Sequence, residues 1–112
     1  MIESLLRNMP SEYIPDKWLI IKFKWGYKVL GTWRGGFADG DHWRMNSGIS
    51  NIEELDNFYL IHGFSGSIYK CFKNNYGFSS LSMGIVSQIM EADADAEVLK
   101  DTSGIMELQY ES

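Results

Sequence analysis

Only one cysteine, two prolines and two histidines occur among the 112 residues of the chain. A lone cysteine, Cys71, cannot form an intramolecular disulfide, which argues against a secreted disulfide scaffold and favours a reducing compartment. Apolar runs such as residues 18–21 are far shorter than the roughly 20 residues that a membrane-spanning helix needs. We therefore expect a cytoplasmic protein with no membrane partner.

Apolar and aromatic side chains, in contrast, are abundant. They make up 45% and 14% of the residues, which is too much bulky surface for a disordered chain. A chain of this length can bury one hydrophobic core but not two independent ones. The composition therefore predicts a single globular domain over residues 1–112.

The net charge of −5 is distributed unevenly. Residues 1–80 carry nine basic and eight acidic side chains, whereas residues 81–112 carry one basic and seven acidic ones. The acidic charge is therefore concentrated at the C-terminal end, and the surface is expected to be bipolar.

The N-terminal third predicts a helix followed by a β-hairpin. Apolar residues at helical spacing over 1–10 indicate a short amphipathic helix that Pro10 ends. Residues 17–25 and 27–34 are rich in β-branched and aromatic side chains and flank Gly26, which is typical of an antiparallel hairpin. Alternation in the first strand predicts a buried face and an outward face. The buried face comprises Leu19, Ile21, Phe23 and Trp25, and the outward face comprises Trp18, Ile20, Lys22 and Lys24.

The middle of the chain predicts further antiparallel strands. A polar loop at residues 35–42 is followed by a strand over 42–55 with a kink at Gly48, which we expect to pair with residues 57–64. The next strand, 67–72, is joined to it through FSGS, where Gly66 suits a tight turn.

The C-terminal part predicts the longer helix. Ser79 or Ser80 is a suitable N-cap, and the apolar spacing continues as far as Leu99. The helix is expected to stop at Gly104, or to break earlier near Ala92 because Asp is a weak helix former. Residues 105–110 alternate and are predicted to form an edge strand that offers a route to a homo-oligomer by strand pairing.

Together these elements predict an α+β fold. We expect one antiparallel, strongly bent sheet of about five strands, close to a small barrel, with a short N-terminal and a longer C-terminal helix. The predicted core comprises Leu19, Ile21, Phe23, Val29, Trp33, Leu60, Phe72, Leu81, Ile85 and Ile89.

The segment HGFSGSIYKCF (62–72) concentrates reactive residue types. A nucleophile elbow needs a glycine two residues after the serine, but Ser67 stands where that glycine would follow Ser65. An enzymatic hypothesis would group Ser65 or Ser67 with His62 and Asp41. We favour a hairpin turn with no catalytic residue, and we interpret Cys71 as a small buried hydrophobe.

Other chemical sites are also not favoured by the sequence. Asp39, Asp41 and His42 lack the further ligands of a calcium loop or a zinc site, so no metal is predicted. Glu53 and Glu54 are adjacent on a strand, where they face opposite ways, and a turn follows at Asp56, so these residues do not have the arrangement of a glycosidase pair. No phosphate-binding glycine loop and no other cofactor motif is present.

Two surface features remain as candidate binding sites. The first is a basic and aromatic face formed by Trp18, Lys22, Lys24, Lys28 and Arg34, which suits nucleic acid because lysines neutralise phosphates and an exposed ring stacks on a base. The second is an acidic patch for a partner with a basic surface. The acidic patch comprises Glu91, Asp93, Asp95, Glu97 and Asp101.

WRMNSGI (43–49) and HGFSGSIYKCFKNNYG (62–77) resemble segments of small accessory proteins of unassigned function that tailed bacteriophages encode. The resemblance implies a protein that binds and blocks a host factor or a defence system in the host cytoplasm.

The predicted function is therefore a non-enzymatic inhibitor or adaptor that acts by stoichiometric protein contact. Direct binding of nucleic acid through the basic face is the alternative.

Overall fold

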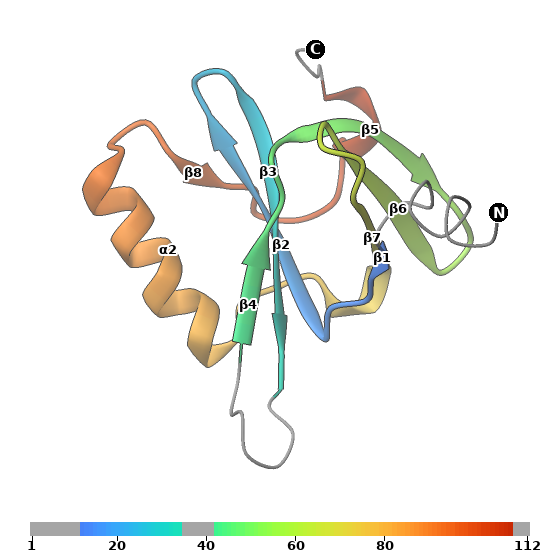
Figure 1. Cartoon of the computed structure of the whole chain (residues 1–112), viewed down its shortest axis with the longest axis horizontal. Coiled ribbons are helices and arrows are strands. Elements are labelled where there is room, and N and C mark those ends of the chain that lie inside the picture. Colours follow the sequence, from blue (N-terminus) through green and yellow to red (C-terminus); the bar gives the residue numbers. More distant parts are fainter. Residues whose placement is uncertain (1–11, 35–41, 109–112) are drawn as a thin grey trace, which may run out of the picture.

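The computed structural model describes residues 12–34 and 42–108, which form two four-stranded sheets and one α-helix (Figure 1). The first sheet has the strand order β1-β7-β6-β5 and the second the order β4-β3-β2-β8. The elements are β1 (Glu12–Tyr13), β2 (Lys17–Phe23), β3 (Gly26–Trp33), β4 (His42–Met45), β5 (Ile49–Glu54), β6 (Phe58–Gly63), β7 (Ile68–Phe72), η1 (Lys73–Asn75), α2 (Ser80–Ala92), β8 (Glu97–Val98) and η2 (Ile105–Glu107).

The predicted α+β class is confirmed, but the prediction of one bent, barrel-like sheet is wrong. The described residues form two open sheets with the larger helix beside one of them (Figure 1). The expected N-terminal helix and most of the loop at 35–42 lie outside the described residues.

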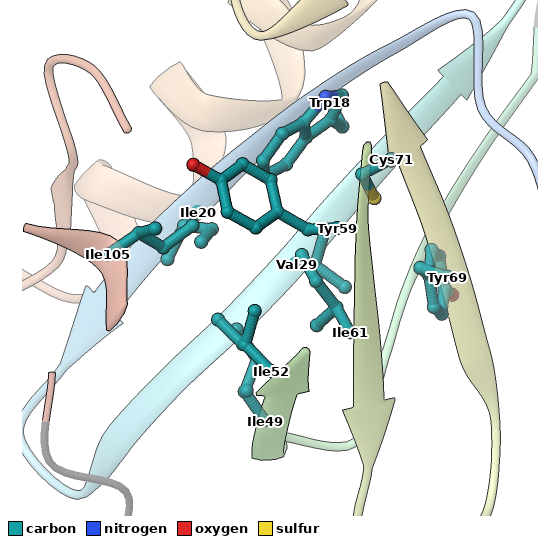
Figure 2. Packing of buried hydrophobic residues seen from close by; sticks show 10 residues of the cluster. All are labelled: Trp18, Ile20, Val29, Ile49, Ile52, Tyr59, Ile61, Tyr69, Cys71 and Ile105. Atoms are coloured by element: carbon teal, nitrogen blue, oxygen red, sulfur yellow. The ribbon is translucent and has the colours of Figure 1, made fainter. Parts of the chain in front are cut away.

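The β2–β3 hairpin is confirmed, with Leu19 opposite Leu30 and Lys22 opposite Tyr27. The prediction that one face of this hairpin points outward is wrong, because Trp18 and Ile20 on that face are fully buried. They pack with Val29 against the other sheet in the core cluster of Figure 2. The opposite face, with Leu19 and its neighbours, packs under α2. The second sheet is therefore covered on both sides, by α2 and by the first sheet.

The strand predicted over 42–55 is two strands that belong to different sheets. Asn46 ends β4, because its backbone N–H donates to the Val29 carbonyl and its Oδ1 accepts from the Val29 N–H. Gly48 has φ +141°, and a Cβ there would lie 2.9 Å from the Phe64 ring. The chain can therefore cross between sheets here only with glycine, which is why the predicted kink at Gly48 is a change of sheet.

In β6 and β7 the predicted pairing is confirmed, as is the turn at Gly66, which has φ +95°. The choice of faces was wrong for two predicted core residues, since Leu60 and Phe72 lie partly exposed on the outer face. The buried face comprises Tyr59, Ile61, Tyr69 and Cys71. Cys71 is fully buried as expected, and burial raises the pKa of its thiol well above the usual value.

Helix α2 begins at the predicted serine cap. The Ser79 hydroxyl accepts from the Ser82 N–H, and the Ser82 hydroxyl accepts from the Ser79 N–H, which forms a reciprocal capping box. The helix ends at Ala92, so Gly104 does not stop it. Gly104 instead precedes η2, and the predicted edge strand over 105–110 is wrong for its described part.

Tyr76 fixes the path of the chain into α2. Its hydroxyl accepts from the Ile20 N–H at 3.2 Å and donates to the Leu99 carbonyl at 2.5 Å, which links β2 to the segment that follows β8. Its ring contacts Trp18 edge-on, with the ring centroids 4.7 Å apart. Burial raises the pKa of Tyr76 to about 12, so this hydroxyl remains a hydrogen-bond donor at neutral pH.

Candidate functional site

The predicted basic and aromatic face is not a single surface. Trp18 is only 1% exposed, and its indole N–H donates to the Phe72 carbonyl at 2.8 Å. Its outward placement is therefore corrected, because the ring is part of the core and is not available to stack on a base.

The four cations of that face are also separated. Lys28 lies opposite Ile21 on the helix-covered side of the sheet, whereas Lys22 lies opposite Tyr27 on the other side. Lys24 stands in the hairpin turn and forms an exposed ion pair with Asp95, at 3.3 Å. Arg34 follows the far end of β3.

An aromatic surface that the sequence interpretation placed in the core lies at the tip of this hairpin. The rings of Phe23 and Trp25 are stacked, with centroids 5.3 Å apart, and the Lys28 ammonium lies 5.4 Å from the Trp25 ring. Trp25 is about half exposed. This arrangement is a cation–π cluster of a kind that also occurs where proteins meet partners.

The acidic patch is divided between a turn and a loop. Glu91 lies in the last turn of α2, Asp93 and Asp95 follow in the connection to β8, and Glu97 is the first residue of β8. The Asp93 carboxylate accepts from the Asp95 N–H at 3.0 Å, which shapes the turn. We call these four residues the acidic turn.

Asp101 lies beyond β8 and does not belong to the acidic turn. Its carboxylate accepts hydrogen bonds from the backbone and side chain of Ser103, and these bonds lower the pKa of Asp101. The helix ends at Ala92, which is one of the two ends that the sequence allowed. The predicted acidic patch is therefore split between the acidic turn and Asp101.

An apolar groove of about 420 Å³ lies between α2 and β8, next to the acidic turn. Phe78 is 47% exposed, Met83 62% and Met90 40%, so much of its lining faces solvent. We call it the α2–β8 groove. It is lined by Phe78, Met83, Val86, Ser87, Met90, Glu97 and Val98.

Sequence reasoning missed this groove, although one signal was present. Met83 and Met90 are seven residues apart and therefore share one side of the helix. That side differs from the one predicted to be buried, which included Ile85 and Ile89. Two methionines on the outward side of an otherwise polar helix face indicate a contact surface, since Met is adaptable at interfaces.

The structure does not bring together the residues of the enzymatic hypothesis. His62 projects from the outer face of its sheet, and its Nε2 lies 2.5 Å from a Glu53 oxygen. Ser67 lies on the inner side, close to the backbone of Gly63. A Cβ added to Gly63 would lie only 2.8 Å from the Ser67 hydroxyl. Ser65 is hydrogen-bonded to Ser47 instead. Asp41 lies outside the described residues.

Within residues 12–34 and 42–108, no group of three or more His, Cys, Asp or Glu side chains is close enough to bind a metal ion. Asp39 and Asp41 of the loop candidate are not described.

A search of family models, curated proteins and solved structures found no significant match to this chain. Among the described residues, no helix is both long and apolar enough to span a membrane.

Proposed function

We propose that the protein is a non-enzymatic binding protein that acts by stoichiometric contact with a partner protein, through the α2–β8 groove and the acidic turn beside it. The observation that carries the proposal is the juxtaposition of these two features at one end of the molecule. Apolar anchors surrounded by charge are the usual composition of a protein interface.

The apolar part of the groove supplies the attraction. Its exposed methionines and Phe78 lose contact with water when a partner side chain enters, and each buried side chain contributes on the order of 1.5–3 kcal/mol. Unbranched methionines adjust their shape to the partner, so the groove can accept an aliphatic or an aromatic anchor.

The acidic turn favours a basic partner. Glu91 lies one helical turn after Ser87, which lines the groove, so a carboxylate stands at the groove's end. In the described part of the chain, Glu91 forms no ion pair, Asp95 has only its exposed pair with Lys24, and Glu97 lies opposite Lys22 across the β2–β8 pairing. Unpaired carboxylates beside an apolar groove attract lysine or arginine residues that flank an apolar anchor.

The role of inhibitor or adaptor of a host or defence factor belongs to the same proposal. It is supported by the resemblance of residues 43–49 and 62–77 to segments of phage accessory proteins. Among the described residues, His62, Ser65 and Ser67 are not brought together, and a small protein with an apolar groove that has an acidic end is suited to masking a basic surface on another protein.

The proposal is tested by selecting peptides from a random display library with the purified full chain as bait. The selected peptides are expected to carry an aliphatic or aromatic anchor with lysine or arginine beside it. Met90→Glu and Met83→Glu should each weaken a selected peptide at least about tenfold, because each places a charge in the apolar groove.

Met106→Glu is the matched control, since Met106 is 43% exposed but belongs to η2, whose Ile105 packs on the other side of the sheet. It should leave peptide affinity unchanged, and circular dichroism should show all three variants folded. Selection of acidic peptides, or equal affinity for the Met90 and Met106 variants, would refute the proposal.

A further inference from the structure

A second concave site lies between an edge strand of the first sheet and an edge strand of the second. β1 is the edge of the first sheet and β4 the edge of the second. Between them is a cleft of about 370 Å³, which we call the edge cleft. Its lining includes Tyr13, Ile14, Trp33, His42 and Arg44.

The aromatic groups of the edge cleft hold one another in place. The Trp33 indole N–H donates to the Ile14 carbonyl at 2.8 Å, which ties β3 to the segment after β1. The Trp33 and His42 rings are parallel, with centroids 5.2 Å apart and an angle of 4° between their planes. Tyr13 meets Trp33 edge-on at 6.4 Å. Rings fixed in this way lose little freedom when a ligand binds.

Arg44 provides the positive charge of the edge cleft. Its guanidinium carbon lies 4.5 Å from the centre of the Tyr13 ring, so the side chain is held against an aromatic face. Within the described residues Arg44 has no ion pair, although the Glu12 carboxylate also belongs to the cleft lining. A guanidinium presents up to five donors in one plane, which suits a phosphate or carboxylate.

A buried hydroxyl lies beneath these groups, beside Arg44. Tyr69 is fully buried and its ring packs against Tyr13, with centroids 5.1 Å apart. Its hydroxyl lies beside the Arg44 side chain and has no other hydrogen-bond partner among the described residues. Burial raises the pKa of Tyr69 to about 12, while the positive charge of Arg44 acts against that shift. The hydroxyl is therefore a neutral donor in the neighbourhood of the guanidinium.

We propose that the edge cleft binds a small anion that carries a planar aromatic ring, of the size of a nucleoside monophosphate, with its ring against the aromatic walls and its anionic group on Arg44. The cleft volume lies near the lower end of the range for small-molecule pockets, which is about 300–1,000 Å³. Aromatic side chains stack on any nucleobase, because every base has a π-face. This site is separate from the α2–β8 groove, so neither proposal depends on the other.

The test is a calorimetric titration of the full-length protein with adenosine 5′-monophosphate and with guanosine 5′-monophosphate. Saturable binding of at least one of them with a dissociation constant at or below about 1 mM is expected. Arg44→Gln should weaken that binding about tenfold or more, because the charge-assisted contact is lost. Arg34→Gln is the matched control, since Arg34 is exposed and lies outside the cleft lining.

Two further titrations separate the halves of the ligand. Adenosine and inorganic phosphate should each bind more weakly than the nucleotide, since each makes only one of the two contacts. The proposal is overturned if neither nucleotide binds, if inorganic phosphate binds as tightly as the nucleotide, or if Arg34→Gln weakens binding while Arg44→Gln does not. Thermal unfolding of both variants establishes that the comparison is between folded proteins.

Discussion

Trp18 is the residue on which most of the fold depends. Its ring lies between the two sheets and contacts the Tyr59 ring (Figure 2). It also contacts the Tyr76 ring, and its indole N–H donates to the Phe72 carbonyl. A tryptophan that fills the space between two sheets while its N–H is hydrogen-bonded gains the burial of its large ring without the cost of an unpaired polar atom. It therefore joins β2, the β6–β7 pair and the segment leading into α2.

Replacement of Trp18 should be far more damaging than replacement of the exposed Trp25. We expect Trp18→Ala to lower the free energy of unfolding by about 3–5 kcal/mol, as large aromatic-to-alanine changes in cores do. Trp25→Ala, at a site 48% exposed, should cost clearly less. Urea denaturation of both variants measures the difference, and equal losses would show that Trp18 is not the centre of the core.

Local signals in the sequence predicted turn and cap residues well, but they predicted less well which face of a strand is buried. Gly66 and Ser79 were placed correctly because a turn and a cap depend on a few neighbouring residues. The faces of β6 were inverted because Leu60 and Ile61 are equally apolar, and a strand shifted by one residue exchanges them. Only the second sheet decides which of them is buried.

At the scale of elements, α2 begins where its sequence specifies and ends where tertiary pairing requires. The capping box of Ser79 and Ser82 fixes the first turn. The apolar spacing continues beyond Ala92, but Val98 instead pairs with Ile21 as the edge of the sheet. The chain must turn back between these points, and the acidic turn results. Sequence periodicity alone could not reveal this strand pairing.

Removal of the Ser79 cap should destabilise the protein, whereas the same replacement at the neighbouring Ser80 should have little effect. Ser79→Ala should lower the free energy of unfolding by about 0.5–2 kcal/mol, because it leaves first-turn N–H groups without their acceptor and breaks the contact with Thr32 at 3.0 Å. Ser80→Ala is the control, since Ser80 is exposed. Thermal or denaturant unfolding compares the two, and a larger effect at Ser80 would contradict the cap assignment.

At the scale of the whole molecule, the described chain has three layers: α2, the β4-β3-β2-β8 sheet and the β1-β7-β6-β5 sheet (Figure 1). The run of four apolar residues at 18–21 in β2 is typical of a strand buried on both faces. Alternation in the rest of the hairpin led instead to one buried face and hence to a single bent sheet. The run itself was the better signal.

The layered arrangement also explains which parts of the candidate site the sequence contained. The acidic residues were recognised because charge is visible in composition. The groove was not, because it forms only where α2 meets the edge strand β8 over the second sheet. The edge cleft likewise requires two strands from different sheets.

The most direct measurement of the central claim is a nuclear magnetic resonance titration of the ¹⁵N-labelled full chain with a peptide selected as described above. The account predicts saturable shifts concentrated at Met83, Met90 and Val98 and at the acidic turn, with a stoichiometry of one peptide per chain. Shifts concentrated instead on the outer face of β6 and β7, with the α2–β8 groove unaffected, would contradict it.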